Sequence, residues 1–243
     1  MAISYPLNLP TTIGIESITL RAEDAVGISS SPFTYKQQIV RFSGQQWGAS
    51  ITIPPLRKDV TEAWVAFLLA LKGPVGTFLL GDPNNCIPQG QLGSDAVSDW
   101  FLAGGTWQDL GVWLDSIDWN ETGGDLTFAR PMVDGAQDAD TETLAIKGLQ
   151  PDEEGWLLPG DYIQLGESNT ATLHKVLLRV DSDSAGYATI EIWPATRRAV
   201  ADEDPVVYLN AKGLFRRRER AQEWSINNSN AYAIAFEAVE AVP

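Results

Sequence analysis

One segment, residues 57–82, limits what this chain can fold into, because it is the only stretch with a clear helical pattern. Its apolar residues recur at a spacing that puts them on one side of a helix: Val60, Trp64, Phe67, Leu68 and Leu71. Gly73-Pro74 cannot continue that helix, and residues 76–80 read as a strand. In nearly all other periodic segments of the chain, apolar and polar residues alternate as they do in β-strands. The sequence therefore predicts a mainly β fold, a β-sandwich or barrel with one flanking helix.

The residues before the helix predict a long hairpin. Residues 13–20 and 38–42 alternate between apolar and polar side chains, as half-buried strands do, and residues 24–32 have the composition of a turn. Residues 47–53 alternate again, and Pro54-Pro55 is expected to end that strand. At the other end of the chain, residues 232–239 alternate and are expected to pair within the same sheet.

Charge divides the chain into two parts. Residues 83–204 contain 22 acidic and 6 basic residues, whereas the rest of the chain contains 10 acidic and 11 basic residues. Such a change predicts two domains. We expect one near-neutral domain built from residues 1–82 and 206–243, interrupted by an acidic, Trp-rich domain over residues 83–205. Strand patterns separated by short turns predict that the inserted domain is a small β-barrel or sandwich.

Composition also excludes several classes of partner and cofactor. The net charge of −15 argues against specific nucleic-acid binding, which needs clustered Lys and Arg. The single cysteine, Cys86, rules out an intramolecular disulfide framework. No apolar run reaches the length of a membrane helix, and the first residues have neither the basic nor the apolar region of a signal peptide. We therefore expect synthesis in the cytoplasm.

Candidate catalytic and metal-binding residues are weak in this sequence. His174, the only histidine, lies in a strand pattern without a nucleophile motif, which favours a structural or surface histidine over a catalytic one. Asp138, Asp140 and Glu142 form only a fragment of a calcium loop and are expected to be a solvated acidic loop. Three carboxylates lie near four tryptophans in the sequence, a combination that glycosidase sites use: Asp109, Asp115 and Asp118. In so acidic a region, such proximity is expected by chance. We predict no catalytic, cofactor-binding or metal-binding residue, and no enzyme.

Two further clusters suggest contacts with macromolecules. Residues 216–220, Arg-Arg-Arg-Glu-Arg, form the only basic cluster. They are interpreted as a contact with an acidic partner surface, and the alternative is the polar face of a strand or turn. Six of the nine tryptophans lie in the acidic region, where most are expected in the core and one or two at the surface.

Several segments together resemble the distal tail proteins of long non-contractile-tailed bacteriophages. The resembling segments are residues 76–83 (GTFLLGDP), 133–138, 144–148, 158–166 (LPGDYIQLG), 186–194 (GYATIEIWP) and 213–236. The resemblance implies a tail-tube-like N-terminal domain that forms a six-fold ring. It also implies a second β-domain, galectin-like or similar to an oligonucleotide/oligosaccharide-binding fold. The second domain expected here is inserted within the first, whereas in some family members the second domain simply follows the first along the chain.

This resemblance implies a structural virion protein. We expect a hub, located at the phage tail tip, that joins the distal end of the tail tube to tip, fibre or receptor-binding proteins, with further copies of itself as its first partner. One alternative is a carbohydrate-binding module that grips a host-surface glycan through Trp107 or Trp113. A second is a glycan hydrolase that uses Asp115 or Asp118.

Overall fold

The computed structural model describes residues 3–10, 15–56, 58–93, 131–226 and 232–242, and its fold is mainly β, as predicted. The chain forms two compact units. Unit 1 comprises residues 1–81, 167–172 and 212–243, and unit 2 comprises residues 82–166 and 173–211.

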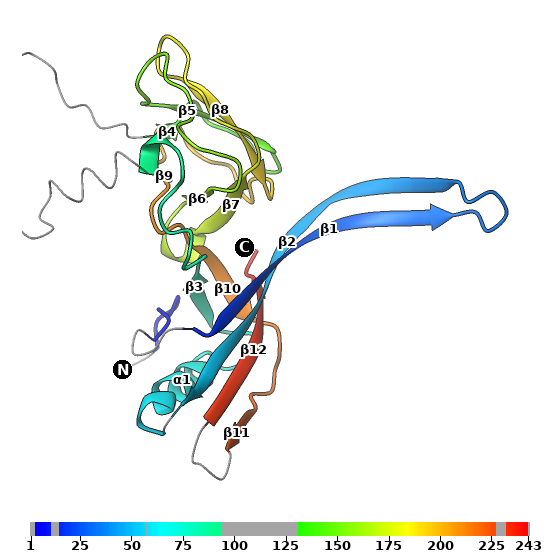
Figure 1. Ribbon diagram of the computed structural model, residues 1–243, viewed down its shortest axis with the longest axis vertical. Helices are drawn as coiled ribbons and strands as arrows, with labels where there is room; N and C mark the ends of the chain where they lie inside the picture. The colour runs from blue at the N-terminus through cyan, green and yellow to red at the C-terminus, as the bar shows by residue number, and fades with distance from the viewer. Residues whose placement is uncertain (1–2, 11–14, 57, 94–130, 227–231, 243) are drawn as a thin grey trace, which may run out of the picture. The chain divides into compact units, whose positions relative to one another are not determined.

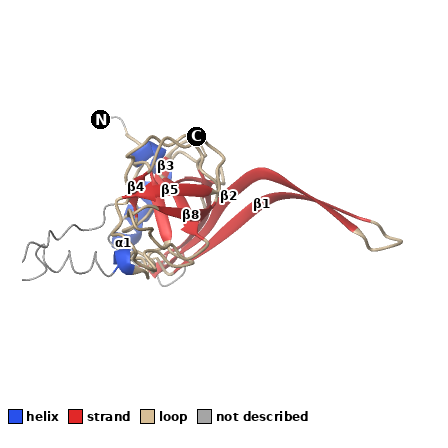
Figure 2. Ribbon diagram, turned by 90° about the horizontal axis from the view of Figure 1, so that it is seen from above, coloured by secondary structure: helices blue, strands red, loops and turns tan. Residues whose placement is uncertain are grey.

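Unit 1 is built on an antiparallel sheet (Figures 1 and 2). Its strands run in the order β1-β2-β12-β10-β3, and β11 pairs with β12. Their bounds are β1 Ser17–Ser30, β2 Gln37–Leu56, β3 Thr77–Leu80, β10 Gly213–Arg217, β11 Trp224–Ile226 and β12 Tyr232–Glu240. The short 3-10 helix η2, Ser168–Thr170, also belongs to this unit. Strands from both ends of the chain thus share one sheet.

The predicted helix is present as α1, Lys58–Ala70. Trp64, Phe67, Leu68 and Leu71 are buried as expected, whereas the side chain of Val60 lies outside the described residues. The Phe67 ring packs edge-on against Trp64 and against Phe78 of β3, with centroid distances of 5.9 and 5.7 Å. The helix therefore covers the core of unit 1 through aromatic contacts.

The predicted hairpin exists, but its expected strand limits are wrong. Residues 24–30, expected as turn, belong to β1, and β2 continues through Pro54 and Pro55. Serine and glycine are tolerated there because they pair in an uninterrupted antiparallel ladder, for example Ser29 with Gln38. The turn itself is confined to residues 31–36.

Unit 2 contains a second antiparallel sheet, in the order β4-β5-β8-β7-β6-β9. The bounds are β4 Met132–Val133, β5 Thr143–Lys147, β6 Tyr162–Leu165, β7 Thr172–Val176, β8 Ala188–Trp193 and β9 Val206–Val207. One core of buried aliphatic side chains with Trp156 fills the unit. Inward residues such as Leu144, Ile146, Ile190 and Ile192 alternate with outward ones along β5 and β8.

The limits of the units differ from the expected ones at three places, the first of which is Asp82, which belongs to unit 2 and not to unit 1. Residues 206–211 belong to unit 2, because Val207 of β9 pairs with Gln164 of β6. Residues 167–172 belong to unit 1, where the backbone N–H of Leu214 donates to the carbonyl of Ala171 over 3.0 Å.

Candidate functional site

The outer part of the hairpin, which we call the arm, comprises residues 25–44 (Figure 1). It begins at a register shift: Asp24 pairs with Gln45, but Val26 pairs with Arg41. One residue of β1 thus opposes three of β2 at this point, and such irregularities bend a hairpin and change its twist. Below the shift, the β2 residues Trp47, Ala49, Ile51 and Ile53 are buried, whereas above it the side chains are exposed.

The arm carries large apolar side chains on both of its faces. Ile28 and Ile39 form a cross-strand pair, with 67% and 62% of their surface exposed. On the other face, Phe42 is 58% exposed and lies over Gly27, whose added Cβ would meet the ring at 3.3 Å. Exposed apolar residues in such a contiguous group mark an interaction surface.

Both edges of the arm are open within the described residues. β12 pairs with β2 only from Gly48 to Leu56, and β1 is the terminal strand of its sheet. A two-stranded ribbon is at best marginally stable in water, and an open edge can accept another strand. The arm is therefore suited to being covered by another protein surface.

The tip of the arm is a turn that displays two aromatic side chains. The N–H of Ser31 donates to the carbonyl of Lys36, and the N–H of Tyr35 donates to the carbonyl of Ser31. These bonds close the turn while Phe33 and Tyr35 remain 93% and 86% exposed. The backbone is thus ordered by its own hydrogen bonds, and the aromatic groups are free to contact a partner.

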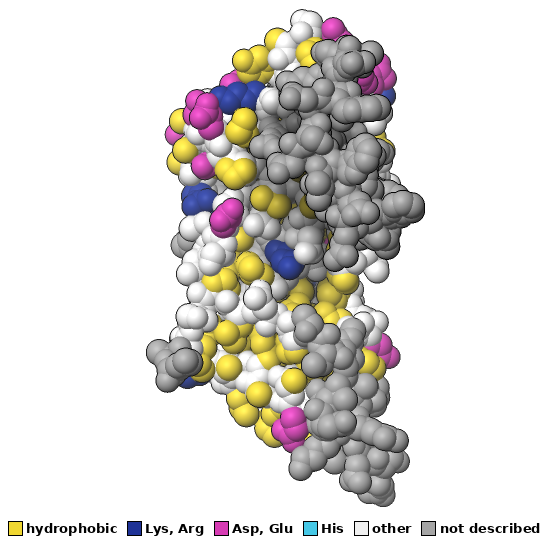
Figure 3. Space-filling view, turned by 90° about the vertical axis from the view of Figure 1, so that its left-hand side faces the viewer, with side chains coloured by type: hydrophobic (Ala, Val, Ile, Leu, Met, Phe, Trp, Pro, Cys, Tyr) yellow, Lys and Arg dark blue, Asp and Glu magenta, His cyan; other side chains and the backbone are white. Residues whose placement is uncertain are grey.

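The arm and unit 2 carry charges of opposite sign. The arm contains Lys36 and Arg41 and no acidic residue, whereas unit 2 contains 22 acidic and 6 basic residues. On the face shown in Figure 3, most of the acidic side chains lie over unit 2 and hydrophobic ones gather over unit 1. The arm is thus a cationic, apolar element of a strongly acidic chain.

Unit 2 has an open groove of about 470 Å³ on the outer face of its sheet. Its floor contains Ala145 of β5 and Thr189 of β8, which are cross-strand partners. Tyr187, one step before β8, lines the groove and is partly exposed. Three carboxylates complete the lining: Asp134, Asp181 and Asp183.

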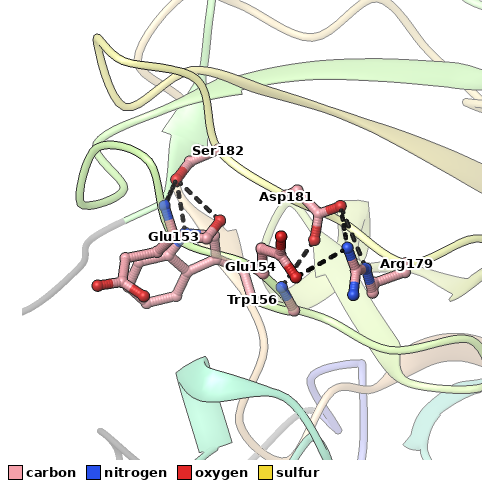
Figure 4. Close-up of polar contacts among 7 residues, drawn as sticks. Glu153, Glu154, Trp156, Arg179, Asp181 and Ser182 are labelled. Carbon is pink, nitrogen blue, oxygen red and sulfur yellow. Dashed lines mark hydrogen bonds and ion pairs between the residues drawn. The ribbon is translucent and has the colours of Figure 1, made fainter.

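A hydrogen-bond network fixes the loop that bears two of these carboxylates (Figure 4). Asp181 accepts from the N–H of Gly155 over 2.8 Å and pairs with Arg179, and these contacts lower the pKa of its carboxyl group. Arg179 also contacts Glu154 at 3.2 Å. Ser182 accepts the indole N–H of the buried Trp156 over 3.0 Å. The loop therefore holds its shape through bonds to the neighbouring segment.

Asp183 stabilises the turn that leads into β8. Its carboxylate accepts from the N–H groups of Tyr187 and Ala185, each over 2.9 Å, and these bonds hold its pKa below the usual range. This carboxylate thus positions Tyr187 at the groove. The backbone N–H of Asp134 donates to the carbonyl of Ala145. The pKa of Lys147 is raised mainly by its bond to Asp202, and the charge of the nearby Asp134 carboxylate adds to that shift.

His174 lies in the interior of unit 2, within β7. It is fully buried, and its Nδ1 lies 2.7 Å from the carbonyl of Pro194, so Nδ1 carries the proton of the neutral ring. Burial is the main cause that lowers its pKa to about 4, and the bond to Pro194 opposes that shift.

The acidic loop Asp138, Asp140 and Glu142 is exposed. In the part of the chain that the structure describes, no group of three or more His, Cys, Asp or Glu residues could hold a metal ion. No described helix is long and apolar enough to cross a membrane. The sugar-related residues Trp107, Trp113, Asp109, Asp115 and Asp118 lie outside the described residues.

The basic cluster is not a uniform contact surface. Arg217 is 2% exposed within β10, where burial lowers its pKa, and one of its Nη groups donates to the carbonyl of Ala221. Arg218 is exposed and lies 3.6 Å from Glu237 of β12. The cluster is thus divided between the interior and the surface of unit 1.

No family model matches this sequence, and no curated protein matches it.

Sequence reasoning missed the arm's exposed apolar faces and the groove. The alternation in residues 38–42 was visible but indicated a half-buried strand, whereas Ile39, Val40 and Phe42 are all exposed. The groove depends on the pairing of Ala145 with Thr189, for which the sequence holds no direct signal.

Proposed function

We propose that this protein is a structural subunit of a bacteriophage tail. In this role it assembles with copies of itself into a ring and joins the distal end of the tail tube to tip, fibre or receptor-binding proteins. The resembling segments named above supply the phage context. The observation that carries self-assembly is the arm, whose apolar residues Ile28, Ile39 and Phe42 are exposed on a ribbon with two open edges.

In a ring of identical copies, the exposed apolar side chains of each arm are buried against a neighbouring copy. A contact between two different patches of the same chain is heterologous, and repeated around an axis it closes into a ring. Every copy then covers the arm of one neighbour and has its own arm covered by the other. The apolar area removed from water provides the driving force.

The decisive experiment is the mass of the full chain in solution, measured by light scattering over a wide concentration range. We expect a species of six copies, populated more strongly as concentration rises. A single-copy mass at every concentration would count against self-assembly. Electron microscopy of virions with the protein labelled would then test its place at the tail tip, and label elsewhere on the particle would contradict the hub.

A further inference from the structure

We propose that the groove of unit 2 binds the arm tip of a second copy of this chain. This inference rests on the proposed self-assembly and assigns to it a specific pair of surfaces. The ligand is a turn bearing two exposed aromatic rings beside a lysine, and the receptor is a groove with small floor residues and an acidic lining.

The tip has the features of an inserted group. Phe33 and Tyr35 are the most exposed large apolar side chains among the described residues, and their turn is closed by backbone bonds. A preordered turn loses little conformational freedom when it binds. Aromatic side chains that enter a pocket are the residues that most often dominate the energy of protein interfaces.

The groove has the size and the lining to receive such a group. Its volume is about 470 Å³ and it is open to solvent, so a ring of the tip would lie on its floor with one side still exposed. The small side chain of Ala145, which points away from the core, leaves space over the strands, and Tyr187 offers a ring for an edge-to-face contact. Its carboxylates are acceptors for a lysine ammonium group or a phenol hydroxyl.

Charge complementarity favours the arm tip of a second copy as the occupant of the groove. Lys36 follows Tyr35 directly, the arm has no acidic residue, and the residues lining the groove include three aspartates and no Lys or Arg. An arm packed against another arm would bring like charges together, which is unfavourable. Asp181 and Asp183 form hydrogen bonds within their own unit, whereas Asp134 acts on the nearby Lys147 through charge, so Asp134 is the carboxylate best placed to meet Lys36.

The test is a charge exchange in the full chain, with assembly measured by mass photometry. We expect Lys36→Asp and Asp134→Lys each to raise the concentration for half-assembly by about tenfold, and the double variant to recover most of that loss. Lys72→Asp and Asp138→Lys are matched controls, since they make the same charge changes at exposed positions outside the tip and the groove. If the single variants assemble like the unaltered protein, the tip–groove contact is wrong while self-assembly stands. If the unaltered protein does not assemble, the proposed function itself fails.

A second measurement identifies the occupant directly. A photoreactive phenylalanine analogue at position 33 is expected to cross-link to the residues 187–189 segment of another copy. Cross-links to the arm of a second copy, or to surfaces outside the groove, would overturn the assignment. So would an assembled protein that gives no cross-link to unit 2.

Discussion

Ile28 and Ile39 lie directly opposite each other on the two strands of the arm, and both are more than half exposed. We predict that replacing both with threonine leaves the free energy of unfolding of the monomer within about 0.5 kcal/mol, because neither side chain is buried. Self-assembly is expected to weaken strongly. Calorimetry and light scattering on the same samples measure the two effects.

The matched change in the same hairpin is Ile51→Thr, where the side chain is 1% exposed. This variant should lose stability by about 2–4 kcal/mol, since it removes a buried apolar group and buries a hydroxyl. Unchanged assembly in the Ile28/Ile39 variant would exclude the arm as the contact surface.

Stability should fall between pH 6.5 and about 4 because of His174. Its pKa is lowered to about 4 in the folded protein, so the unfolded chain binds more protons in this window. The buried ring stays neutral down to about pH 4, whereas the imidazole of the unfolded chain takes up a proton as pH falls below 6.5. Stability is therefore lost progressively across this window, to a total of about 3 kcal/mol. Urea unfolding across this range should show a shallower pH dependence for His174→Gln than for the unaltered protein. Equal slopes would contradict the assignment.

Phe78 is expected to be a major determinant of the stability of unit 1. Its ring is fully buried between Phe67 of α1 and Phe236 of β12, with centroid distances of 5.7 and 6.2 Å. Phe78→Ala should cost about 3–5 kcal/mol, measured by denaturant unfolding. Phe33→Ala, which removes the same group from the exposed tip, is the control and should leave stability nearly unchanged.

Gly186 should not tolerate a side chain. Its φ is +78°, and an added Cβ would lie 2.2 Å from the carbonyl oxygen of Leu149. Gly135 has a similar φ of +70°, but no atom lies within 4 Å of its added Cβ. Gly135→Ala should therefore cost about 1–2 kcal/mol, the strain of the left-handed conformation alone. Gly186→Ala should cost clearly more, and similar melting temperatures for the two variants would contradict the close packing at Leu149.

The parts of the fold that depend on local periodicity were predictable. Trp64, Phe67 and Leu68 recur at helical spacing, so the buried side of α1 could be assigned before the structure was known. The length of β1 was not predictable, because Ser29 and Ser30 have turn propensity and only pairing with β2 makes them strand.

The candidate site was harder to predict because it depends on contacts between distant residues. The predicted turn, residues 24–32, ended just before Phe33 and Tyr35, so neither their position at the tip nor their exposure was predicted. Asp134 and Tyr187 come together only through the register of β5 and β8, and register is set by the whole sheet.

The pairing of Leu80 with Gly213 has a consequence for the architecture of the chain. Unit 2 departs after β3 and the chain returns at β10, and these two strands are neighbours in one ladder. Between these two junctions the chain re-enters unit 1 once, at residues 167–172, where the carbonyl of Ala171 accepts from the N–H of Leu214. Because the two junctions are adjacent, unit 2 can be exchanged without rethreading the sheet of unit 1, provided that this contact is replaced. A chimera that carries a different domain between these two strands would keep the same arm, which makes unit 1 a reusable frame and unit 2 an interchangeable module.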